Sequence, residues 1–131
     1  MAGWTKLNLK EEVEDQAPKF GMSPDMEFRS ARVPLELEKA GVSYLRLAPN
    51  YRMPFGHHHD VQEEVYVLVA GSARLKLDDE VIDLEPFDAV RIERETMRNL
   101  EGGPGGAEVI LFGTPNTGPD DAQTMPGWWT D

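Results

Sequence analysis

The three histidines of the chain lie side by side at His57, His58 and His59, and Glu64 follows five residues later. Side chains alternate between faces along an extended backbone, so His57 and His59 point to one side and His58 to the other. Glu64 stands at an odd offset from His59, so a turn or bulge over residues 60–62 is needed to bring its carboxylate to the same side. Two imidazoles and one carboxylate that converge suit a divalent metal, and we predict a metal site at His57, His59 and Glu64.

The segments around these residues read as short strands separated by turn signals. Residues 65–70 are apolar on both faces, which is typical of a strand buried between two layers or at a subunit contact. Further strands are predicted at 42–47, 73–77, 81–84, 87–92, 96–100 and 107–112, with a poorly alternating first candidate at 27–33. Between them we expect a turn at Gly71-Ser72, a hairpin turn at 78–80 and a flexible glycine-rich loop over 102–106.

Many short strands with frequent turns predict an all-β sandwich or barrel. Residues 34–40 are the one candidate for a short helical turn, with a strand or loop as the alternative, because Pro34 opens the segment and Gly41 closes it. We expect a single domain over 1–131, with a barrel core at about 27–113, a short N-terminal segment, and a tail over 114–131 in which the core is already finished. Trp128 and Trp129 should fold back onto the barrel or onto a second subunit.

Two stretches resemble the motifs of the cupin family. The first match is carried by His57, His59, Glu64 and Gly71, and the second, over 86–98, by Pro86, Asp88, Val90, Ile92 and Thr96. The resemblance covers about residues 40–113 and implies a double-stranded β-helix, or jelly roll, that forms a homodimer. The second motif departs from the family at Phe87, Glu93 and Glu95, and Arg98 stands where the family's last histidine ligand would be.

The arginine leaves two interpretations of the site open. In one, His57, His59 and Glu64 hold a metal, and Arg98 binds a substrate carboxylate or oxyanion with its planar, permanently charged fork. In the other, no metal binds, and Arg98 makes a charge-assisted hydrogen bond to Glu64 within a polar network. Tyr66 and Met97 are expected in the wall of the ligand pocket together with Arg98.

Composition narrows the classes of partner. Thirteen basic and twenty-four acidic residues give a net charge of −11, which disfavours nucleic acid and anionic membrane surfaces as partners. The chain has no cysteine, so disulfides and thiolate metal sites are excluded. The first residues lack the apolar core of a signal peptide, and no apolar run approaches a membrane span. We therefore expect a cytoplasmic protein.

Three functions remain compatible with these features. The first is a metal-dependent enzyme that acts on a small, anionic organic molecule and uses zinc, nickel, manganese or iron. The second is a non-catalytic module that binds a small molecule. The third is a dimeric barrel with a vestigial site. The sequence assigns no catalytic residue and no substrate.

Overall fold

The structure is a computed structural model that describes residues 3–114, 118 and 120–131. It contains one short 3-10 helix, η1 (Ala17–Phe20), and antiparallel strands. The strands are β1 (Met26–Ser30), β2 (Gly41–Leu47), β3 (Phe55–His59), β4 (Glu64–Leu77), β5 (Glu80–Leu84), β6 (Ala89–Ile92), β7 (Arg98–Gly113) and β8 (Ala122–Pro126). The predicted all-β class is confirmed. The segment over 34–40 contains turns but no helix, so the helical alternative for it is wrong.

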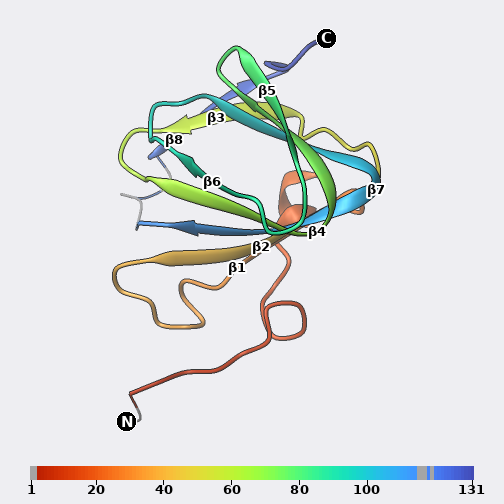
Figure 1. The fold of residues 1–131 in the computed structure, drawn as a ribbon. Coiled ribbons are helices and arrows are strands. Elements are labelled where there is room, and N and C mark those ends of the chain that lie inside the picture. The colour runs from red at the N-terminus through yellow and green to blue at the C-terminus, as the bar shows by residue number, and fades with distance from the viewer. Residues whose placement is uncertain (1–2, 115–117, 119) are drawn as a thin grey trace.

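The sheet curls into a barrel because two long strands, β4 and β7, run through both of its halves (Figure 1). In one half the strand order is β1-β2-β7-β4-β6, and in the other it is β8-β3-β7-β4-β5. The side chains that face inward from the two halves meet between them. This arrangement confirms the predicted jelly roll.

The long strands bend where the register between β4 and β7 shifts, between Leu68 and Ala70 and again between Gly71 and Ala73. Gly71 has a φ of +80°, and a Cβ there would lie 2.1 Å from the carbonyl oxygen of Gly106, so only glycine fits this crossing. The predicted turn at Gly71-Ser72 and loop over 102–106 are therefore wrong. Both are bulged parts of continuous strands, and the bulges supply the bend that closes the barrel.

The tail contributes a strand, which differs from the expectation that the core ends at Gly113. β8 pairs with β3 from Phe55 opposite Pro126 to His59 opposite Ala122. Trp129, 5% exposed, is buried against its own chain. The guanidinium of Arg52 lies over its ring at 4.1 Å from the centroid. The expectation that the tail folds back onto the barrel is confirmed.

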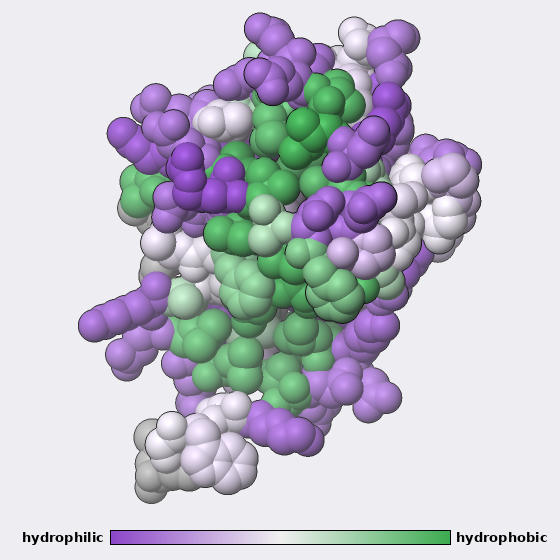
Figure 2. Space-filling model, in the orientation of Figure 1, coloured by the Kyte–Doolittle hydropathy of each residue, from purple (hydrophilic) through white to green (hydrophobic). Residues whose placement is uncertain are grey.

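Among the described residues, no helix has the length and hydropathy that a membrane span requires. The core is built from buried apolar side chains of the central strands, among them Leu45, Leu47, Leu68, Leu75, Ile92, Leu100 and Val109. Several large apolar side chains remain exposed, and Figure 2 shows apolar surface running through the middle of the viewed face between hydrophilic margins.

Candidate metal centre

The predicted ligands converge because the chain bends between two strands. His57 and His59 occupy alternate positions of β3, which ends at His59, and Glu64 begins β4 after a bend over 60–63. The Nε2 atoms of His57 and His59 lie 3.8 Å and 3.2 Å from Glu64 Oε1. The three residues each offer one ligand atom, and these three atoms lie within 4.8 Å of one another. The bend that the spacing required is present.

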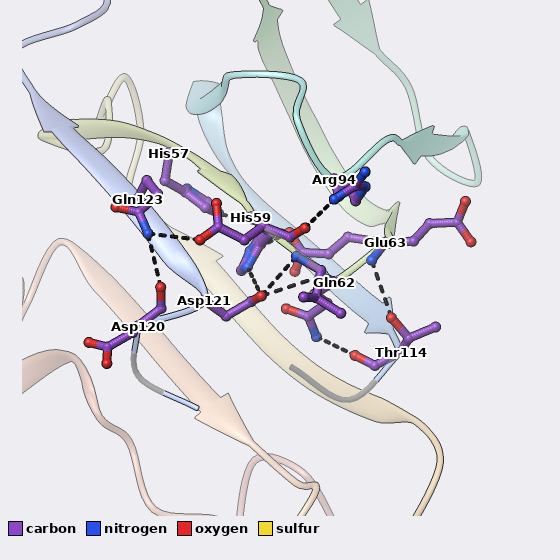
Figure 3. Close-up of polar contacts among 12 residues, drawn as sticks. His57, His59, Gln62, Glu63, Arg94, Thr114, Asp120, Asp121 and Gln123 are labelled. Carbon is purple, nitrogen blue, oxygen red and sulfur yellow. Dashed lines mark hydrogen bonds and ion pairs between the residues drawn. The ribbon is translucent and has the colours of Figure 1, made fainter. Parts of the chain in front are cut away.

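Asp121 orients one of these histidines. His59 Nδ1 lies 2.8 Å from Asp121 Oδ2, and the Asp121 carboxylate also accepts hydrogen bonds from the backbone N–H groups of Val61 and Gln62 (Figure 3). Asp121 is 1% exposed and lies just before β8. Sequence reasoning missed it, because the tail carries no local motif that links it to the histidines. Only the pairing of β8 with β3 brings it to the site.

The electrostatics of the site set the protonation of its groups. Burial raises the pKa of Glu64, but hydrogen bonds from His57 and His59 and the charge of Arg98 outweigh it and hold the pKa far below its usual range. Burial lowers the pKa of His57 and keeps that ring neutral. For His59 burial acts in the same direction, but Glu64 and Asp121 together raise the pKa. For Asp121, burial is outweighed by the bonds from His59 and the two backbone N–H groups, so its pKa is lowered.

These donors fit a divalent metal. Ionised Asp121 only accepts hydrogen bonds, so His59 Nδ1 carries a proton and donates a hydrogen bond to the Asp121 carboxylate. The other ring nitrogen, Nε2, then faces Glu64. A carboxylate and an imidazole lone pair at 3.2 Å repel each other unless a proton or a metal ion lies between them. His57 Nδ1 is buried and makes no hydrogen bond within the described structure. Imidazole and carboxylate donors of this kind suit zinc, nickel, manganese and iron.

Arg98 lies behind the site. Its side chain is fully buried, and Nη1 donates a hydrogen bond to Glu64 Oε1 at 2.5 Å. The other guanidinium nitrogens donate to the carbonyl oxygens of Glu93, Arg94 and Thr96. The charge-assisted bond to Glu64 that one interpretation required is therefore present. The same contacts turn the guanidinium toward the protein and away from any ligand.

A cavity of about 700 Å³ opens beside the three candidate ligands. Tyr66 lines it, and burial raises the pKa of its hydroxyl well above the usual range, so the hydroxyl stays protonated. Arg98 and Met97 are not among the lining residues, which differs from the ligand-binding role expected for them. Met97 lies beside the β4–β5 turn instead, where its backbone N–H donates to the Asp78 carboxylate. His58 is on the opposite face of β3 and is not part of the converging group.

Comparison with solved structures identifies the architecture. A cupin protein from Bacteroides fragilis superposes with a TM-score of 0.70 at 21% identity, covering 100% of this chain and 99% of its own. Oxalate decarboxylase from Bacillus subtilis gives 0.73 at 17% identity over 92% of this chain and 33% of its own. The polyketide cyclase RemF from Streptomyces resistomycificus gives 0.73 at 15% identity over 97% of this chain and 87% of its own. No family model and no curated protein matches the sequence.

Proposed function

We propose that this protein, which has the cupin fold, binds one divalent metal ion through His57, His59 and Glu64 and a small organic molecule in the adjoining cavity. The observation that carries the proposal is the convergence of the two Nε2 atoms on a buried carboxylate, with Asp121 orienting one of the rings. A bound divalent ion would supply Lewis-acid polarisation of an oxygen atom of the organic molecule. Three protein ligands leave coordination positions for water and that molecule.

The protein's own residues have separate tasks in this arrangement. Asp121 holds the His59 ring in the orientation that presents Nε2. Arg98 donates a short hydrogen bond to Glu64, and its charge adds to the effect of His57 and His59 in keeping Glu64 ionised. Tyr66 contributes to the cavity wall and keeps its buried hydroxyl protonated.

Elemental analysis of protein purified without chelators tests the metal. We expect about one zinc, nickel, manganese or iron ion per chain, and loss of that ion in His59→Ala. His58→Ala is the matched control, because His58 lies on the same strand but faces away from the converging group. Negligible metal in the parent protein, with no stabilisation when metal is added to it, would refute the metal proposal.

The Arg98–Glu64 ion pair favours a second candidate, a cupin-fold module that binds a small molecule without metal. A guanidinium next to the carboxylate neutralises charge that a metal would otherwise use, and it repels a divalent ion. A ligand recovered unchanged from metal-free protein supports this candidate. Turnover of a substrate that a chelator abolishes supports a metal-dependent enzyme.

We also propose a homodimer, supported by exposed apolar side chains that include Phe87 and Phe112. Trp129 no longer supports it, because its own chain buries that ring. Sedimentation at micromolar concentration tests the proposal, and a monomer at high micromolar concentration would refute it.

A further inference from the structure

The cavity beside the candidate metal centre has mostly apolar walls. Thioether, aromatic and aliphatic side chains from η1, the following loop and the strands of both halves form them: Phe20, Met22, Met26, Phe28, Leu45, Met53, Phe55, Leu111 and Phe112. Methionine side chains adapt to irregular shapes, and their sulfur atoms make favourable contacts with aromatic rings. Walls of this kind stabilise a ligand with a flat apolar body more than they stabilise a small charged one.

Three strongly polar residues of the cavity lining, His57, His59 and Glu64, bring their ligand atoms within 4.8 Å of one another. A small carboxylate ligand would bring its negative charge next to the Glu64 carboxylate on the cavity wall. Arg98, which could have offset that charge, is fully buried and bonded to protein oxygens. Within the described lining, Arg32 is the one arginine or lysine, and it lies at an exposed position. Without a bound metal, the cavity thus offers a small polyanion little compensating positive charge.

We propose that the cavity takes an uncharged molecule with an apolar, ring-sized body and one oxygen head group, such as a phenol. The body packs among the methionine and phenylalanine side chains, and the head group reaches His57 and His59. A volume of about 700 Å³ accommodates more than one ring. The head group's position rests on the proposed function, whereas the apolar body rests on the cavity walls alone.

The methionines provide a direct readout. Met22, Met26 and Met53 line the cavity, and Met97 and Met125 do not. In protein labelled with ¹³C at the methionine methyl groups, naphthol should shift the three cavity signals and leave those of Met97 and Met125 unchanged. Naphthol should bind about tenfold more tightly than phenol, because its second ring buries more apolar surface. In the metal-free protein, oxalate, a small dianion, should produce no saturable shift.

A pair of substitutions on β8 shows whether the probe enters the cavity. Thr124 is exposed and lines the cavity, whereas its neighbour Met125 is exposed and does not. Thr124→Trp should weaken naphthol binding at least about tenfold by filling space in the cavity, and Met125→Trp should leave it unchanged. Equal weakening in both variants would overturn the assignment of the cavity.

The titration is run on metal-free and on metal-loaded protein, which separates this inference from the metal proposal. Saturable shifts of the cavity methyls by naphthol in metal-free protein support the inference even if no metal binds. Tighter binding of oxalate than of naphthol to the metal-free protein overturns it, whether or not the protein also binds metal. The inference is also overturned if the cavity methyl signals do not shift with naphthol but change when the protein is diluted. A second copy of the chain would then cover the cavity.

Discussion

Arg98 and Glu64 form a buried ion pair in which Arg98 Nη1 donates to Glu64 Oε1 at 2.5 Å. Arg98 begins β7 and Glu64 begins β4, so the pair joins the first residues of the two strands that run through both halves of the barrel. The same carboxylate oxygen faces Nε2 of His57 and of His59. Arg98 therefore links the stability of the barrel to the charge of the candidate metal centre.

Replacing this arginine should change stability and metal affinity in opposite directions. In Arg98→His, Glu64 and the carbonyl groups of Glu93 and Thr96 lose their partner, and the metal-free protein should lose about 3–5 kcal/mol of unfolding free energy. Metal affinity should rise, because a fixed positive charge is removed and an imidazole donor is added. Urea unfolding without metal and titration with zinc chloride measure the two effects.

Arg98→Lys is the control for this prediction, because it keeps the positive charge but loses the planar fork. Its stability should fall, and its metal affinity should not rise. An unchanged metal affinity in Arg98→His would contradict the prediction and place the imidazole outside the coordination sphere.

Asp121→Asn should weaken metal binding without removing a ligand. The amide keeps the size of the side chain but loses the negative charge that orients His59 and raises the pKa of its ring. Loss of such an orienting partner lowers metal affinity by about tenfold to a hundredfold. Asp120→Asn is the matched control, because Asp120 is adjacent to Asp121 in the sequence but is exposed. If competition with a chelator gave the same metal affinity for both variants, the orienting role of Asp121 would be wrong.

Gly71→Ala should destabilise the barrel at its bend. The positive φ and the approach of a Cβ to the Gly106 carbonyl oxygen should together cost about 2–4 kcal/mol of unfolding free energy. Gly105→Ala, on the opposing stretch of β7, should cost far less, because a Cβ there meets nothing within 4 Å. Urea unfolding of the two variants is the measurement, and equal losses would show that the bulge tolerates a side chain.

Acid should weaken the attachment of β1, which carries Met26 and Phe28 in the cavity wall. A hydrogen bond from Arg46, with a further bond from Arg29, lowers the pKa of Glu27 from its usual 4.5 despite partial burial. A carboxyl group whose pKa is lower in the folded state stabilises the protein above its unfolded pKa, and this contribution is lost as the pH falls through the folded pKa.

Glu27→Gln should therefore be less stable than the parent protein at neutral pH by about 1 kcal/mol. The difference should shrink as the pH falls below 4.5, where Glu27 of the unfolded chain takes up its proton first, and vanish below the lower pKa of folded Glu27. Thermal unfolding of both proteins across this pH range is the measurement, and a difference that does not change with pH would contradict the assignment.

The sequence by itself determined the features that depend on neighbouring residues. Alternation along an extended backbone placed His57 and His59 on one face, and the odd offset to Glu64 required the bend that lies between β3 and β4. The turn signals and apolar alternation predicted the all-β class. The resemblance of both motifs to the cupin family predicted the jelly roll that the solved structures share.

Only the tertiary structure decided the features that depend on distant pairing. Asp121 reaches His59, 62 residues away in the sequence, through the pairing of β8 with β3. Arg98 is directed to Glu64 and not to the cavity because carbonyl groups of the loop before β7 accept its remaining hydrogen bonds. Gly71 reads locally as a turn, and the facing strand at Gly106 makes it a bulge. The contacts of Asp121 with His59, of Arg98 with Glu64 and of Gly71 with Gly106 join residues far apart in the sequence, so a pattern of adjacent residues could not decide them.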